Sequence, residues 1–241
     1  MDTIKIMNRG NCKIVAHRGL SYLETENTIP AFIAAADRSY HAIETDVHVT
    51  SDGKIIVIHD SSTARVAAGR DVSVEENTFS LLRTVELADK EGRVGRIDLR
   101  MPSLAEYIDI CRRYDKLSVL ELKNHMPPSA IKTIVDEIRL QGMLDRVIFI
   151  SFDLDNLKKL RELLPEQRLM YLTGDYTPQI LDDLKKYRLD LDVYHGVVTA
   201  DMVNELHSLG IRIGVWTCDD LSRADELIGM EIDYLTTNCL E

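Results

Sequence analysis

The sequence predicts one (β/α)8 barrel, a closed ring of parallel strands covered by helices on its outside. Three observations support this prediction. The length of 241 residues is common for such a barrel. Short β-rich runs alternate with amphipathic helical segments almost to the end of the chain. Polar residues stand at the C-terminal ends of several strands, which meet at one mouth in a barrel but spread along an edge in a doubly wound open sheet, the main alternative.

Eight β-rich runs and seven amphipathic runs carry the alternation. The predicted strands are 13–17, 43–47, 119–123, 147–151, 169–172, 193–197, 212–216 and 234–237. The predicted helices are 28–39, 103–114, 129–142, 154–164, 178–187, 200–210 and 220–230. Cap residues or an early proline open several helices, as at Thr28-Ile29-Pro30 and Ser103, while Gly142 and Gly210 close others. We therefore expect residues 1–241 to form a single barrel domain.

An extra hairpin is predicted after the second strand. The run 55–60 follows 43–47 too closely for a helical crossover, so it must return antiparallel. Asp52-Gly53 predicts a two-residue turn, which would pair Asp46 with His59. Residues 61–102 lack regular alternation and are interpreted as a small insertion over the barrel mouth, in which 75–90 could form one helix.

The predicted register gathers ionisable groups at one place. Glu44, Asp46 and His59 would share one face of the hairpin. Two carboxylates buried together raise each other's pKa unless a cation compensates, and oxygen donors favour a hard ion, Mg²⁺ or Ca²⁺. The alternative is a pair of solvated acids on an exposed hairpin. The strand context and the neighbouring histidine favour the cation site.

Composition limits the classes of partner. A formal charge of -11 argues against a nucleic-acid partner and against electrostatic binding to an anionic membrane. The chain has no long apolar segment that would be a signal peptide or would insert stably in a membrane, so a cytoplasmic protein is expected. The 4 cysteines show no C-x-x-C spacing and are interpreted as reduced core thiols. The oligomeric state is left open.

Several motifs together resemble the glycerophosphodiester phosphodiesterase family. They are VAHRGLSYLETENTIPAF at 15–32, IETDVHVTSDGKIIVIHD at 43–60 and LELKN at 120–124. The family pattern is H-R-G, E-N-T, E-x-D, H-D and E-x-K, and each motif occurs here in that order. Each triplet alone is weak, but the ordered set, which runs from about Ile14 to Asn238, is specific.

The resemblance implies a barrel that hydrolyses glycerophosphodiesters, small-molecule substrates, to glycerol 3-phosphate and an alcohol with one divalent cation, Mg²⁺ or Ca²⁺. By position it implies metal ligands, an acid–base pair and phosphate contacts. These are Glu44, Asp46 and Glu121 for the metal, His17 and His59 for proton transfer, and Arg18 and Lys123 for the phosphate. Trp216 could stack on the alcohol or pack in the barrel rim, and Asp60 could orient His59 or cap the following turn.

The chain departs from the family pattern at three places. Thr25 stands where a proline usually precedes E-N-T. Asn238 occupies the position of the acid in a usual T-D. Cys218-Asp219 replaces a common Val-Asn after Trp216 and Thr217, so contacts to the leaving alcohol are expected to differ.

The chemistry accounts for these residue types. A phosphodiester needs preorganised positive charge more than a protein nucleophile, and two imidazoles suit the proton transfers. We assign His17 as base and His59 as acid. The attacking group could be water or the substrate's own glycerol 2-hydroxyl, which would give a cyclic phosphate. The alternatives are a phospholipase-like lyase that releases the cyclic phosphate and a non-catalytic phosphate-binding barrel.

Overall fold

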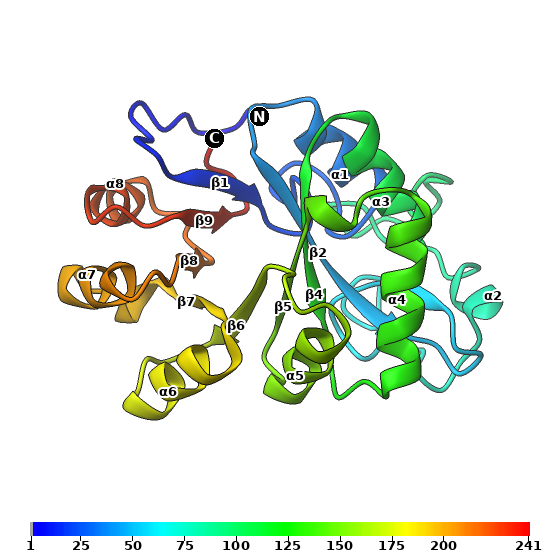
Figure 1. The fold of residues 1–241 in the computed structure, drawn as a ribbon. Coiled ribbons are helices and arrows are strands. Elements are labelled where there is room, and N and C mark those ends of the chain that lie inside the picture. Colours follow the sequence, from blue (N-terminus) through cyan, green and yellow to red (C-terminus); the bar gives the residue numbers. More distant parts are fainter. Residues whose placement is uncertain (1) are drawn as a thin grey trace.

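A computed structural model describes residues 2–241, and its strands form a closed parallel barrel (Figure 1). The hydrogen-bonded order is β1-β9-β8-β7-β6-β5-β4-β2, and β1 pairs with β2 to close the ring. The strands are β1 (Lys13–Ala16), β2 (Ala42–Val49), β4 (Leu117–Leu122), β5 (Val147–Ser151), β6 (Leu169–Thr173), β7 (Asp190–Tyr194), β8 (Ile213–Trp216) and β9 (Tyr234–Thr237). The predicted barrel is confirmed, and the open sheet is excluded.

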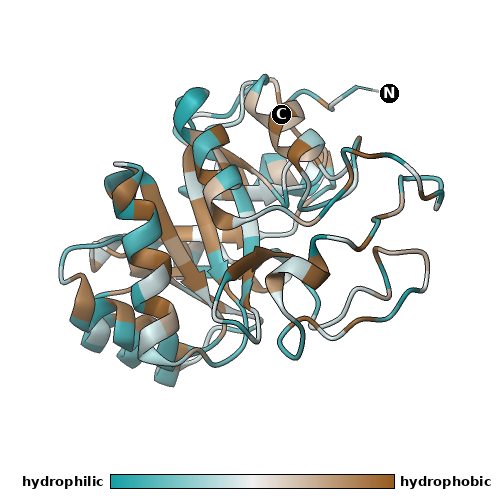
Figure 2. Ribbon diagram, turned by 90° about the vertical axis from the view of Figure 1, so that its right-hand side faces the viewer, coloured by the Kyte–Doolittle hydropathy of each residue, from teal (hydrophilic) through white to brown (hydrophobic). Residues whose placement is uncertain are grey.

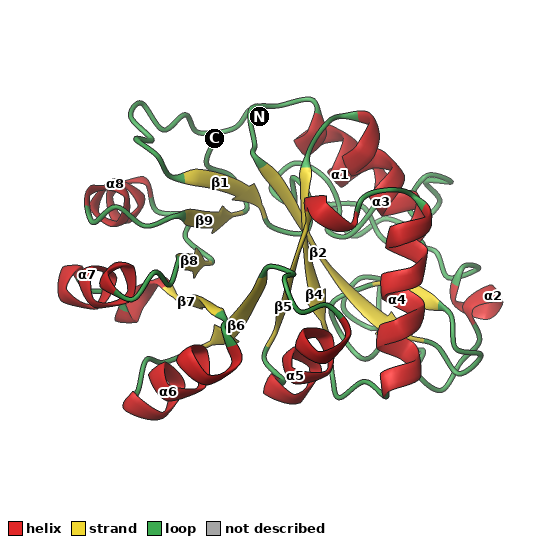
Figure 3. Cartoon of the chain, viewed as in Figure 1, coloured by secondary structure: helices red, strands yellow, loops and turns green. Residues whose placement is uncertain are grey.

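Helices surround the ring of strands, as Figure 3 shows. They are α1 (Ile29–Ala36), α3 (Leu104–Arg113), α4 (Pro128–Leu140), α5 (Leu154–Leu163), α6 (Pro178–Tyr187), α7 (Ala200–Ser208) and α8 (Leu221–Gly229), with 3-10 turns η1 (Leu144–Arg146) and η2 (His195–Val197). Each of these α-helices corresponds to a predicted helix, whereas the two 3-10 turns were not predicted, and cap residues explain several helix starts. At α3, Ser103 and Glu106 form a reciprocal capping box. Thr28 caps α1 through its side-chain oxygen.

The predicted strand 193–197 is displaced. In the structure β7 begins at Asp190 and ends at Tyr194, and η2 follows it. The neighbouring strands set these bounds. Asp190 is the first residue of β7 that pairs with β6, and Tyr194, its last residue, lies opposite Trp216 at the end of β8. The apolar run at 193–197 belongs partly to the turn that leaves the barrel.

The antiparallel return strand exists as β3 (Ile55–Val57), but the predicted register is wrong by one residue. Val47 lies opposite Val57, and Ile58 donates its N–H to the carbonyl of Asp46 at 3.1 Å. The loop has three residues rather than two, and its Gly53 takes the left-handed conformation, with φ +74°. His59 is therefore not directly paired with Asp46; it follows the end of β3 in a bend.

The insertion 61–102 contains one short helix, α2 (Phe79–Leu82), rather than a helix across 75–90. The apolar side chains of the insertion pack against β3 and form a small core. This packing holds most of the segment in an irregular conformation, so the helix does not extend beyond α2. This core contains Ile56, Ile58, Ala67, Val74, Leu82, Val85, Leu87, Leu99 and Met101. Polar contacts also tie the insertion to the loop after β1: Thr25 donates to the carbonyl of Ala88, and Lys90 donates to the carbonyl of Ser21.

Apolar side chains fill the lower barrel interior and the layer between strands and helices. Figure 2 shows apolar colouring along the strands and on inward helix faces, while outer helix faces are hydrophilic. Val15, Ala42, Val119, Ile148 and Met170 form part of the interior cluster. Among the described residues, no helix is long and apolar enough to cross a membrane. Glu44, Asp46 and Glu121, by contrast, are buried acids on two of the strands.

Candidate active site

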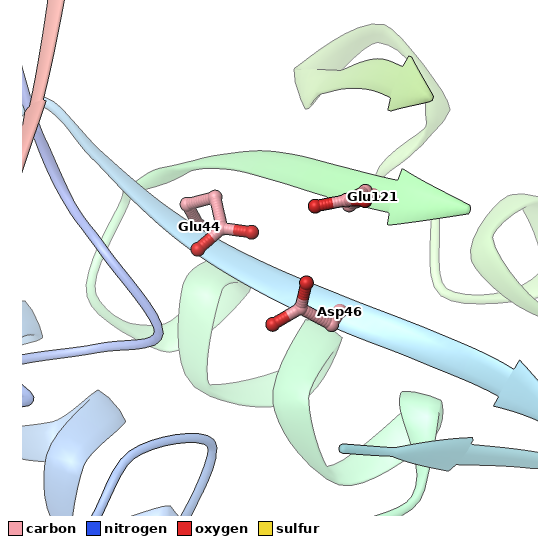
Figure 4. Close-up of side chains that lie close together, drawn as sticks. All are labelled: Glu44, Asp46 and Glu121. Atoms are coloured by element: carbon pink, nitrogen blue, oxygen red, sulfur yellow. The ribbon is translucent and has the colours of Figure 1, made fainter. Parts of the chain in front are cut away.

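Three carboxylates from two neighbouring strands face one another in the barrel mouth (Figure 4). Glu44 and Asp46 are two residues apart on β2 and so share a face, and Glu121 on β4 lies opposite Asp46 in the strand register. One oxygen of each carboxylate lies within 4.8 Å of one from each of the others. Glu44 is 3% exposed, Asp46 1% and Glu121 7%.

Burial and mutual repulsion control the charge of these acids. Burial, with the neighbouring carboxylates, raises the pKa of Glu44 well above its usual value and that of Glu121 to about 8. Burial alone would also raise the pKa of Asp46, but Arg18, His59 and Lys123 lower it to about 2. Oδ1 of Asp46 is buried and has no hydrogen-bond partner among the described residues. An unpaired buried oxygen within an all-oxygen cluster fits a hard divalent cation.

Two cations border this cluster, and they follow β1 and β4, the strands on either side of β2. Arg18 donates its backbone N–H to Glu44 at 2.8 Å, and its Nε lies 3.4 Å from Oδ2 of Asp46. Lys123 donates to Oε1 of Glu121 at 2.7 Å and lies 3.7 Å from Oδ1 of Asp46. Arg18 and Lys123 are both mostly buried, so neither forms a simple surface ion pair. Their charges are available to an anion in the mouth.

The turn after β1 explains the H-R-G motif. Arg18 has φ +54° and Gly19 has φ +75°, so the chain reverses sharply as it leaves the strand. A Cβ on Gly19 would lie 2.7 Å from the carbonyl carbon of Ala31, a contact that no side chain tolerates. The glycine therefore lets the loop pack on α1 and keeps His17 and Arg18 at the mouth.

The two predicted imidazoles both lie near the acidic cluster. Burial lowers the pKa of each, Arg18 lowers it further, and Asp46 raises it. Nδ1 of His17 lies 2.8 Å from Oδ1 of Asn238. Nδ1 of His59 lies 2.6 Å from Oδ1 of Asp60. Each ring is thus held through Nδ1, which leaves its Nε2 outside these contacts.

Asp60 orients His59, which answers the question that the sequence left open. Its other oxygen accepts from Nε of Arg65 at 2.7 Å, and Arg65 also donates both terminal nitrogens to Glu26, at 2.7 and 2.8 Å. Glu26 in turn accepts from Arg18 at 2.8 Å. A continuous chain of ion pairs therefore connects the loop after β1 with the loop after β3.

Asn27 directly precedes the cap of α1 but makes its own contacts at the mouth. Thr28 is the cap of α1. Asn27, at φ +56°, donates Nδ2 to Oδ2 of Asp46 at 2.8 Å and accepts from Oγ of Thr45 at 2.7 Å. It therefore orients one of the candidate metal ligands directly.

Aromatic side chains form the opposite part of the rim. Trp216 ends β8 and packs edge-to-face on Phe152, with ring centroids 5.5 Å apart, and lies 5.9 Å from the ring of Tyr194. Phe152 and Tyr194 are exposed, which leaves an apolar surface open to the mouth. Ser151, at the end of β5, directs its hydroxyl to the carbonyl of Leu122 and not into the mouth.

Sequence reasoning missed the residues that hold the histidines in place. Arg65 belongs to an irregular segment without a motif. His48 is buried on the hairpin, and its Nε2 lies 3.0 Å from the carbonyl oxygen of His59. Asp219 binds Asn238, the partner of His17. No periodic signal marks such partners, although the departures from the family pattern at 219 and 238 did mark one pair.

The closed barrel, with buried acids, two cations and two imidazoles at its C-terminal mouth, defines an enzyme of the (β/α)8 class. The sequence profile of the Glycerophosphoryl diester phosphodiesterase family matches residues 17–241. The chain therefore belongs to this family, and it is a phosphoric diester hydrolase that acts on glycerophosphodiesters.

Individual relatives agree with this assignment. A glycerophosphodiester phosphodiesterase of Caldanaerobacter subterraneus subsp. tengcongensis is 26% identical over 229 residues, which cover 93% of each chain. A glycerophosphodiester phosphodiesterase structure from Parabacteroides distasonis has a TM-score of 0.80 at 27% identity and covers 96% of this chain and 94% of its own. An Oleispira antarctica phosphodiesterase in complex with the product sn-glycerol-3-phosphate has a TM-score of 0.86 at 22% identity, covering 94% and 92%.

Proposed function

We propose that the chain hydrolyses glycerophosphodiesters to glycerol 3-phosphate and an alcohol, with one divalent cation and with His17 and His59 as the acid–base pair. The observation that carries this proposal is the convergence of Glu44, Asp46 and Glu121 within 4.8 Å, buried and bordered by both imidazoles and two cations. We also propose that residues 1–241 form one barrel domain, in which 61–102 is a small insertion over the mouth.

The three acids would hold the cation, Mg²⁺ or Ca²⁺. When bound, the cation would neutralise charge on the phosphate oxygens and compensate the buried carboxylates. The chain's own cations add to this field: Arg18 can grip two phosphate oxygens in a fork, whereas Lys123 acts as a point charge. Asn27 and Lys123 hold Asp46 and Glu121 in place, so the ligand oxygens need little reorganisation.

The surroundings of the two imidazoles support different roles. His59 is backed by Asp60, a carboxylate that stabilises a positively charged ring. His17 is backed by the neutral amide of Asn238 and lies beside Arg18, so its neutral form is favoured. His17 therefore suits the base that takes a proton from the attacking hydroxyl, and His59 suits the acid that protonates the leaving oxygen.

The deciding experiment is a substrate panel with Mg²⁺, Ca²⁺ or a chelator, in which products are identified as open or cyclic phosphates. Glycerophosphocholine should be cleaved only with a cation, the chelator should inhibit reversibly, and glycerol 3-phosphate should accumulate. Turnover that is unchanged in the chelator would remove the metal from the proposal. A cyclic phosphate as the final product would favour the lyase, and phosphate binding without cleavage of any diester would favour the non-catalytic barrel.

A further inference from the structure

Two of the positions at which the chain departs from its family pattern lie against each other. Nδ2 of Asn238 donates to Oδ2 of Asp219 at 2.6 Å. Oδ1 of Asp219 accepts from the backbone N–H of Asn238 at 2.7 Å and from Oγ of Thr237 at 2.9 Å. The aspartate in the loop after β8 therefore holds the asparagine that follows β9 through both of its oxygens.

These contacts fix which way the Asn238 amide points. A carboxylate accepts only, so the NH₂ group of Asn238 must face Asp219. Its oxygen must then face the other side, where Ser21 donates its hydroxyl at 2.7 Å and Nδ1 of His17 lies at 2.8 Å. Since an amide oxygen also accepts only, the neutral His17 ring must carry its proton on Nδ1, and its Nε2 then keeps a lone pair.

We propose that Asp219 is a positioning residue for His17: through the Asn238 amide it selects the tautomer whose Nε2 can accept a proton. The inference rests on the proposed function in taking His17 as the base. The path runs Asp219, Asn238, His17, and no atom of Asp219 needs to touch the substrate. Asp219 is exposed, so it acts by orienting the amide rather than by its distant charge.

The hydrogen-bond pattern predicts what an isosteric change would do. In D219N one oxygen must still accept from Thr237 and from the backbone of Asn238, so the new NH₂ would face the NH₂ of Asn238. Turning the Asn238 amide over relieves this donor–donor contact and presents NH₂ to Nδ1 of His17. The proton of His17 then moves to Nε2, and the ring loses its free acceptor there.

The reciprocal exchange should restore the arrangement. In D219N/N238D the new aspartate at 238 accepts from the amide at 219 on one side and from Nδ1 of His17 on the other. N238D alone would place two carboxylates against each other and should be worse than the double variant. The two positions are thus expected to be coupled: the loss of kcat in the double variant should be much smaller than the sum of the losses in the two single variants, expressed as free energies.

The experiment combines two measurements. Steady-state kinetics are measured with added Mg²⁺ or Ca²⁺, and ¹⁵N NMR spectra of the histidine rings are recorded without added metal. Wild type should show His17 protonated on Nδ1, and D219N should show it protonated on Nε2. In D219N kcat should fall by about 10- to 100-fold with little change in KM, as for other partners of catalytic groups, and the double variant should recover both signals. D225N, an exposed acid-to-amide change on α8, is the matched control and should match wild type.

Clear results would overturn the proposal. The first is a wild-type protein in which His17 carries its proton on Nε2. The second is a D219N variant whose His17 tautomer or kcat equals that of wild type. The third is a double variant that is no more active than D219N. If D219N does not fold, D219A replaces it, with a mixture of tautomers expected because the amide loses its acceptor. The NMR readout needs no turnover, so it tests the positioning role even if no glycerophosphodiester is cleaved.

Discussion

The two halves of the barrel mouth contrast in chemistry and in exposure. The half built by β1, β2 and β4 carries charged groups that are almost fully buried, with Asp46 at 1% exposure. The half built by β5, β7 and β8 carries aromatic rings that remain open, with Phe152 at 49% and Tyr194 at 43%. Buried charges require a partner of opposite charge, whereas exposed aromatic rings offer a surface to which an apolar group can bind. From this difference we expect the phosphate to bind in the first half and the organic part of the substrate in the second.

The largest effect should come from the charged half. Asp46→Asn removes a candidate ligand and also the carboxylate that pairs with Arg18 and accepts from Asn27. Loss of several kcal/mol of charge stabilisation corresponds to a decrease in kcat/KM of at least about 10⁴-fold. Calorimetric titration with Mg²⁺ and Ca²⁺ should show lost binding. Asp201→Asn, an exposed residue on α7, is the control, and wild-type affinity in D46N would refute the ligand role.

The histidines come next in size. His17→Ala and His59→Ala should each lower kcat by about 10²- to 10⁴-fold, because each removes a proton transfer but leaves the acidic cluster intact. Circular dichroism and cation affinity should match wild type. His207→Ala, which removes an imidazole from α7 paired with Asp233, serves as the control. Full activity in either site variant would mean that its imidazole carries no proton in the reaction.

The charged half could be predicted from the sequence to a greater extent than the contacts that hold it. Strand periodicity and barrel closure predicted that Glu44, Asp46 and Glu121 meet at one mouth, and the resemblance to the family assigned them as metal ligands. The hairpin register was wrong since one left-handed residue, Gly53, lengthens the loop by one position. Arg65 and Asp219 could not be placed, because irregular segments have no period from which a partner can be inferred.

Stability should also distinguish the charged half. Without a cation, the pKa of Glu121 is about 8 and that of Glu44 is well above its usual value, so the folded protein binds more protons than the unfolded chain. The free energy of unfolding should therefore fall as pH rises from 7 to 8, toward the pKa of Glu121. Chemical denaturation at several pH values, with a chelator present, measures how steeply the free energy of unfolding depends on pH. Glu121→Gln should flatten this dependence, as should saturating Mg²⁺ or Ca²⁺ in wild type; an equal slope in all three would contradict the assignment.

The aromatic half should give the smallest effect and a different kinetic signature. Trp216→Ala removes the ring that packs on Phe152 and Tyr194 and leaves the three acids in place. Stacking contributes about 0.5–1.5 kcal/mol, so KM for glycerophosphocholine should rise by up to about tenfold while kcat changes little. Tyr114→Ala, an exposed ring just beyond α3, is the matched control. If Trp216→Ala lowered kcat as strongly as His59→Ala does, the division of the mouth into a reacting half and a binding half would be wrong, because the rim would then be positioning the phosphate itself.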